Sequence, residues 1–170
     1  MSRVAVVTDS TADIPADVAA AYGIRVVPCQ LLFGDQVFRD GVDLNSAEFY
    51  RRLRESPVLP TTSQPTTGDF IQVYREVSRW ADSIVSIHIS AALSGTVEFA
   101  QTAVAQMESP MPIYVVDSRL VSMALGLVVL AAAEMAARGL DAPHIVERVT
   151  ALIPHVNVLF VVDTLEYLHR

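Results

Sequence analysis

Apolar-rich runs alternate with amphipathic stretches along the whole chain. The apolar runs end at polar residues and cover positions 4–8, 83–89, 113–116 and 156–162. Such runs are typical of strands that are buried on both faces of a parallel sheet. Apolar positions at helical spacing, flanked by capping and breaking residues, predict helices over positions 15–22, 46–55, 67–79, 95–107, 121–138 and 141–153. A last helix is expected to begin at Asp163.

A β-rich run at positions 24–33 is followed by Gly34-Asp35 and a second run at 36–39. This pattern predicts a small hairpin. Elsewhere strands and helices alternate, which predicts an α/β domain with a mainly parallel sheet and helices on both faces. Ligands bind such sheets outside the carboxyl ends of the strands.

Two uncharged polar segments stand out near those strand ends. Positions 60–68 hold four threonines, a serine and a glutamine, and positions 90–96 hold Ser94-Gly95-Thr96 after an apolar run. We expect both segments to be loops that meet over an apolar pocket. A glycine beside a serine at a helix start exposes backbone N–H groups, which favour anions. Thr62 and Ser63 would add hydroxyls from the other side, and because neither segment contains arginine, a carboxylate suits them better than a phosphate. Helix capping alone is the competing explanation for these residues.

Composition narrows the function classes. The net charge is -7 and all 12 basic residues are arginine, so the basic patch expected for nucleic acid or anionic lipid is absent. Apolar residues make up 52% of the chain, which fits a sheet covered on both sides, an aliphatic cavity or an interface. The uncharged apolar run at 120–133 is shorter than the ~18 residues of a membrane span. With a single cysteine, Cys29, and no signal peptide at the start, we expect a cytoplasmic protein without an integral membrane segment.

Enzyme motifs are scarce. Neither a dinucleotide fingerprint, a phosphate-binding loop nor a nucleophile elbow occurs, and the four histidines lack metal spacing, so we expect no metal and no cofactor. One alternative is an enzyme that acts on a small acid or phosphate ester with Asp9 or Ser94 as nucleophile. Another is a module that serves only for interaction.

Five segments in order resemble the DegV family. They span positions 8–15, 62–65, 90–96, 115–118 and 163–168. The resemblance implies a two-domain α/β fold that binds one long-chain fatty acid, such as palmitate. Some family members are the acyl-carrying subunit of a bacterial fatty acid kinase and present the carboxylate to a separate ATP-binding subunit, so this chain would be a lipid carrier and not itself an enzyme.

The resemblance also implies roles for individual residues. The carboxylate would be held by Thr62 and Ser94, with the backbone N–H of Gly95 assisting and Ser63 adjacent. Family chains continue into a second domain, so positions 1–170 are expected to form the N-terminal domain, truncated before the second.

Overall fold

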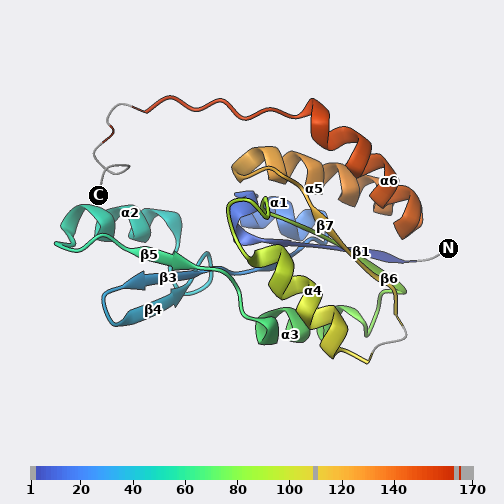
Figure 1. Ribbon diagram of the computed structural model, residues 1–170, viewed down its shortest axis with the longest axis horizontal. Helices are drawn as coiled ribbons and strands as arrows, with labels where there is room; N and C mark the ends of the chain where they lie inside the picture. Colours follow the sequence, from blue (N-terminus) through green and yellow to red (C-terminus); the bar gives the residue numbers. More distant parts are fainter. Residues whose placement is uncertain (1–2, 109–110, 163–164, 166–170) are drawn as a thin grey trace.

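The computed structural model describes residues 3–108, 111–162 and 165, and its centre is a four-stranded parallel sheet (Figure 1). The strands lie in the order β2-β1-β6-β7. Their bounds are β1 (Val4–Asp9), β2 (Arg25–Val27), β6 (Ser83–His88) and β7 (Ile113–Asp117). All pairings in this sheet are parallel, as the alternation of strands and helices predicted.

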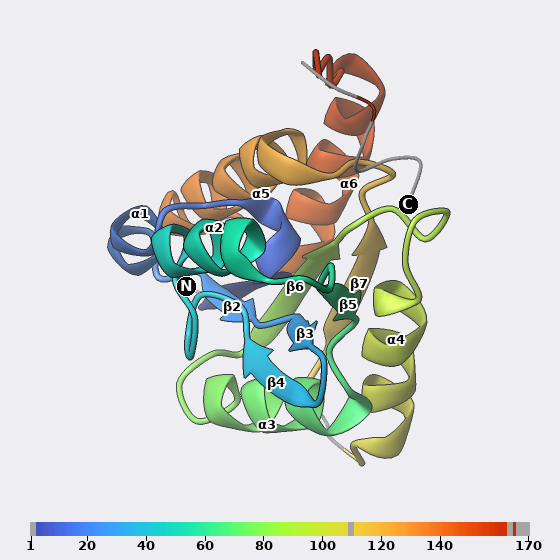
Figure 2. The same ribbon diagram turned by 90° about the vertical axis from the view of Figure 1, so that its left-hand side faces the viewer.

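Helices cover both faces of this sheet, which confirms the predicted fold class (Figure 2). One face packs against α3 (Thr67–Val77) and α4 (Thr96–Gln106), and the other against α5 (Ser122–Ala137) and α6 (Ala142–Leu152). Successive residues of a strand point to opposite faces. On β1, Ala5 and Val7 therefore join the α3 side, while Val6 joins the α5 side.

A second, antiparallel sheet forms a small lobe with order β4-β3-β5. It comprises β3 (Gln30–Phe33), β4 (Gln36–Arg39) and β5 (Thr61–Ser63), and it carries α2 (Ser46–Glu55). The β3–β4 hairpin is confirmed. The single run predicted at 24–33 is wrong, because the chain leaves one sheet after Val27 and enters the other at Gln30. Pro28 lies between them, and a proline has no N–H to donate to a ladder.

Positions 60–68 are not wholly a loop, because Thr61–Ser63 forms β5 on the free edge of β3. Threonine is β-branched and favours strands. The pairing places Thr62 opposite Leu31 and gives the backbone groups of β3 a second partner. The segment then ends at Thr66, which caps α3 through a capping box with Asp69.

The final strand predicted at 156–162 is also wrong. After the short 3-10 helix η2 (Ile153–His155), these residues are extended but pair with no strand among the described residues. Leu159, Phe160 and Val161 are 97%, 78% and 97% exposed. An apolar sequence favours a strand only where a neighbour supplies hydrogen bonds. The helix expected from Asp163 lies outside the described residues, apart from Leu165.

Candidate functional site

The turn that carries Ser94 leaves the carboxyl end of β6 and leads into α4. The Ser90 N–H donates to the Leu120 carbonyl at 2.9 Å, and the Ser94 N–H donates to the Ser90 carbonyl at 3.1 Å. Gly95 occupies the N-cap position of α4. A glycine has no side chain with which to cap, so the first N–H groups of this helix receive no bond from the N-cap residue.

Gln64, which directly follows β5, lies close to this turn. A methyl group added at Gly95 would lie 3.4 Å from Gln64 Nε2, so the two predicted polar segments approach each other there. Thr62 is exposed, whereas Ser63 and Ser94 are half-buried. Ser94 Oγ lies 2.9 Å from Thr96 Oγ1, and this short chain of hydroxyls has no charged partner. Uncharged donors thus gather at the carboxyl edge of the sheet, while the assignment of Thr62, Ser63, Ser94 and Gly95 to a carboxylate remains a prediction.

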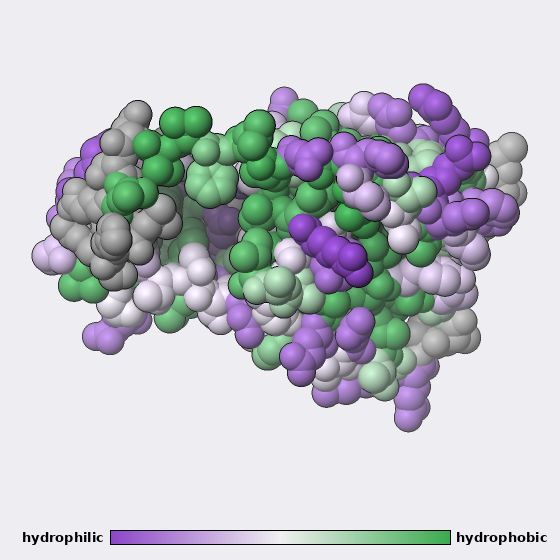
Figure 3. All heavy atoms as spheres, turned by 45° about the horizontal axis from the view of Figure 1, so that its top comes forward, coloured by the Kyte–Doolittle hydropathy of each residue, from purple (hydrophilic) through white to green (hydrophobic). Residues whose placement is uncertain are grey.

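A cavity of about 560 Å³ lies at the carboxyl end of β1, between the start of α1 (Ala16–Ala21) and the turn that precedes α2, and the four predicted head-group residues are not part of its lining. Its volume is within the ~300–1,000 Å³ usual for ligand pockets. Its wall is largely apolar and includes Ala12, Ile14, Val26 and Pro28. Figure 3 shows the molecule hollowed between the lobe on its left and the main body, with hydrophobic side chains along the hollow.

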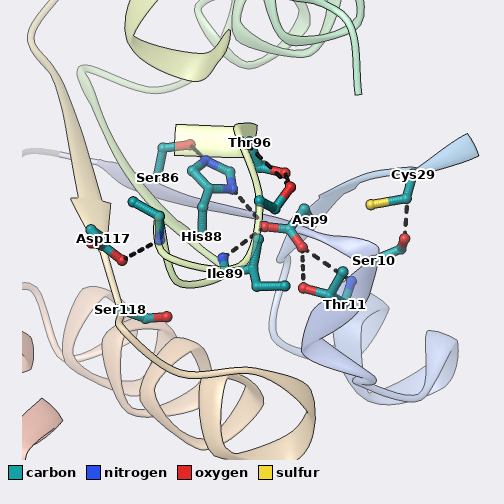
Figure 4. A network of polar contacts seen from close by, with 12 residues as sticks. Asp9, Ser10, Thr11, Cys29, Ser86, His88, Ile89, Thr96, Asp117 and Ser118 are labelled. Atoms are coloured by element: carbon teal, nitrogen blue, oxygen red, sulfur yellow. Dashed lines mark hydrogen bonds and ion pairs between the residues drawn. The ribbon is translucent and has the colours of Figure 1, made fainter. Parts of the chain in front are cut away.

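The largest polar network of the site is fully buried beneath this edge (Figure 4). His88 Nδ1 lies 3.0 Å from Asp9 Oδ2, and His88 Nε2 lies 2.7 Å from Ser86 Oγ. Ser86 Oγ in turn lies 2.9 Å from the Tyr74 hydroxyl. The sequence analysis singled out neither Ser86 nor Tyr74. The available signal was that Ser86 and His88 are two residues apart and so lie on one face of a strand.

Tyr74 determines which atom of each hydrogen bond in this network carries the proton. Its hydroxyl is buried and, among the described residues, has only Ser86 as a partner. A hydroxyl that must donate there makes Ser86 an acceptor from Tyr74 and a donor to His88 Nε2. We therefore assign the proton of His88 to Nδ1, which donates to Asp9.

Burial and hydrogen bonding oppose one another at Asp9. Burial raises the pKa of this carboxyl, but the hydrogen bonds from His88, Thr11 and the Ile89 N–H outweigh it and hold the pKa below its ordinary value. Burial also raises the pKa of Tyr74, against its hydrogen bond with Ser86. At Cys29, burial is the largest cause of a pKa raised to about 11, so the thiol stays protonated.

The arrangement does not favour the alternative nucleophiles. Asp9 has no exposed surface, and both of its carboxylate oxygens accept hydrogen bonds. Ser94 has Thr96 and not a histidine as the partner of its hydroxyl. Asp9, His88 and Ser86 have the order of a catalytic triad, but Ser86 is itself fully buried and its oxygen is occupied by the Tyr74 hydroxyl.

Within residues 3–108, 111–162 and 165, no three His, Cys, Asp or Glu side chains gather as a metal site. In the same part of the chain, none of the helices combines the length and the apolar character that crossing a bilayer requires.

Known proteins are similar to this chain in both sequence and fold. Residues 3–170 match the model of a family described as uncharacterised proteins of the DegV family. A DegV domain-containing protein of Deinococcus radiodurans is 39% identical over 165 residues, which cover 97% of this chain and 58% of that protein. The chain thus spans little more than half the length of this relative.

Two solved structures are similar over most of this chain. The first, described as showing fatty acid binding of a DegV family protein from Thermus thermophilus, has a TM-score of 0.81 and 38% identity. The match covers 89% of this chain and 54% of that one. The second is DegV, a fatty acid binding protein from Bacillus subtilis, with a TM-score of 0.84, 32% identity and coverage of 91% and 55%.

Proposed function

Because the chain belongs to the DegV family, we propose that it binds one long-chain fatty acid. Relatives from Thermus thermophilus and Bacillus subtilis are described as fatty acid binding proteins. The observation in this chain that supports the proposal is the close approach of the Gln64 side chain to Gly95, because Gln64 directly follows Thr62 and Ser63 and Gly95 directly follows Ser94. Uncharged donors and an apolar cavity at one edge of the sheet fit a carboxylate with an aliphatic tail.

The head group is bound by hydrogen bonds and not by a charge. Thr62 and Ser94 donate from their hydroxyls, the Gly95 N–H assists, and Ser63 lies beside them. A hydrogen bond to a charged group contributes about 1.5–3 kcal/mol. These few bonds select a carboxylate from other polar groups and orient it at the surface.

The tail supplies most of the affinity. Burial of each CH₂ group contributes about 0.8 kcal/mol, so the apolar wall gains more from a long chain than the head group does from its donors. We place the tail in the cavity lined by Ala12, Ile14, Val26 and Pro28. Asp13 and Asp40 also line that cavity, and they would repel a carboxylate but not a hydrocarbon.

We further propose that the protein presents the bound carboxylate to a separate kinase subunit and performs no chemistry itself. The half-exposed head-group residues suit this role, because a partner must reach the carboxylate. The kinase subunit, and not this protein, would bind the ATP. We place both proteins in the cytoplasm. That residues 1–170 are the N-terminal domain of a two-domain cleft also stays a prediction.

The test measures palmitate affinity by isothermal titration calorimetry. We expect Thr62→Ala with Ser94→Ala to raise the Kd about 150-fold or more, the equivalent of two lost bonds to a charged group. Thr102→Ala, on the exposed face of α4, is the matched control and keeps the wild-type Kd. An unchanged Kd in the double variant refutes the head-group assignment. Native mass spectra of protein from cells that show no fatty acid, together with no binding of added palmitate, refute the function.

A further inference from the structure

Asp9, His88 and Asp117 form a row across the carboxyl edge of the parallel sheet. They are the last residues of β1, β6 and β7. His88 is in register with Asp117, and the pairing of Val7 with Ser86 places Asp9 beside His88. The turn that carries Ser94 leaves the middle strand directly after His88. Its course therefore begins between two carboxylates.

Those two carboxylates hold the backbone of the turn from both sides. Asp9 Oδ2 accepts from the Ile89 N–H at 3.1 Å, and Asp117 Oδ1 accepts from the Ala91 N–H at 3.1 Å. Further along, the Ser94 N–H bonds back to the Ser90 carbonyl. The position of the Ser94 hydroxyl is thus determined by how Asp9 and Asp117 are oriented.

The orientation of Asp9 is in turn set by its donors. Thr11 donates to Oδ1 from both its N–H, at 3.1 Å, and its hydroxyl, while His88 and the Ile89 N–H donate to Oδ2. His88 is itself held by Ser86 and by the edge-on ring of Phe70, whose centroid lies 5.1 Å away. With the proton order assigned above, every donor in this network has an acceptor.

Asp9 and His88 are fully buried, although Asp9 is also among the residues that surround the cavity described above. Their effect on the edge of the sheet passes through the Ile89 N–H and the turn that follows it. We propose that Asp9 and His88 are positioning residues that keep the Ser94 turn in its binding conformation. The claim about the turn stands on the contacts above, and its consequence for a ligand rests on the proposed function.

The test compares Asp9→Asn, His88→Asn and the control Asp141→Asn. In Asp9→Asn, an NH₂ group replaces one of the two carboxylate oxygens, each of which accepts hydrogen bonds from two donors. In His88→Asn, the amide N–H takes the place of the imidazole Nδ1–H and keeps the bond to Asp9. Asp141 caps α6 on the surface, and asparagine caps a helix equally well. Amide hydrogen exchange of Ile89, Ala91 and Ser94 is measured without ligand, and the palmitate Kd is measured separately.

We expect Asp9→Asn to raise both the exchange rates in the turn and the palmitate Kd by about tenfold or more, as the loss of a bond to a charged group implies. Exchange at Val149 in α6 stays as in the wild type. Asp141→Asn stays within about threefold of wild type in both measurements, while His88→Asn, which keeps the bond to Asp9 but not the bond to Ser86, raises both by less than Asp9→Asn does. A folded Asp9→Asn protein with wild-type exchange in the turn and a wild-type Kd overturns the proposal.

The two claims fail separately. If the wild type binds no palmitate, the proposed function is refuted, and exchange in the turn alone decides whether Asp9 positions it. If the wild type binds and Asp9→Asn binds equally well, the function stands and the positioning role is refuted. Should Asp9→Asn not fold, His88→Leu replaces it. The leucine, which also loses the bond to Asp9, is then expected to raise exchange in the turn more than His88→Asn does, and equal exchange in these two variants overturns the proposal.

Discussion

Ser86→Ala tests the buried hydrogen-bonded chain at its middle. Ser86 accepts from Tyr74 and donates to His88 Nε2, at 2.9 and 2.7 Å, and all three side chains are buried. Removing the hydroxyl leaves two groups without partners, the Tyr74 O–H and His88 Nε2. Tyr74→Phe is different, because Ser86 keeps its bond to His88 and loses only a bond that it accepts.

The magnitudes follow from the number of groups left unpaired. A buried polar group that loses its partner costs about 1–3 kcal/mol, so Ser86→Ala should lower the free energy of unfolding by about 4 kcal/mol. Tyr74→Phe loses one neutral hydrogen bond and should cost about 1 kcal/mol. In the double variant only His88 Nε2 is unpaired, which predicts a loss of about 2 kcal/mol. Tyr74→Phe is therefore stabilising in the Ser86→Ala background.

Urea denaturation followed by circular dichroism measures the four proteins of this cycle at one pH. The decisive quantity is the sign of the effect of Tyr74→Phe when Ser86 is already alanine. If that effect is as destabilising as in the wild type, the Tyr74–Ser86 bond contributes nothing and the proton order assigned to His88 is wrong. Ser78→Ala, at an exposed position after α3, controls for the change from serine to alanine.

Three further outcomes are expected. Gly126→Ala should lower the free energy of unfolding by about 1–3 kcal/mol, since its new Cβ would lie 2.5 Å from the Ala12 carbonyl oxygen. The control Gly68→Ala, whose new Cβ would have its nearest neighbour at 3.5 Å, should not lower it. Equal urea midpoints of the two variants contradict this prediction. The folded pKa of Asp9 lies below the ordinary 3.8, so its contribution to stability is present above about pH 4 and is lost as pH falls through the folded pKa. Urea midpoints of Asp9→Asn should accordingly depend less on pH there, and parallel acid profiles would exclude this. Ala16→Phe should fill the cavity and shift preference to shorter acyl chains, which a chain-length series of Kd values checks.

Much of the fold was predictable because it depends on local pattern. The runs that became β1, β6 and β7 are apolar on both faces, and only a sheet covered on both sides buries them. The starts of α2 and α6 followed from Asn45 and Asp141, which accept backbone N–H groups as N-caps. The two polar segments were recognised by composition, since hydroxyls without charge at strand ends are unusual.

Pairing between distant segments decided the rest. Positions 61–63 read as a loop until the free edge of β3 supplied hydrogen bonds, and positions 156–162 read as a strand although no described strand lies beside them. Strand propensity describes only the local preference of a segment, whereas a strand forms only where a neighbouring strand supplies hydrogen bonds.

Composition and spacing by themselves determined an acidic α/β domain whose polar residues gather at the carboxyl edge of its sheet. Only the tertiary structure decided that Asp9 and His88, 79 residues apart in the chain, share a proton-ordered network beneath the Ser94 turn. The physical reason is that a buried carboxylate needs donors from wherever the fold can supply them, and sequence distance does not reveal which ones these are.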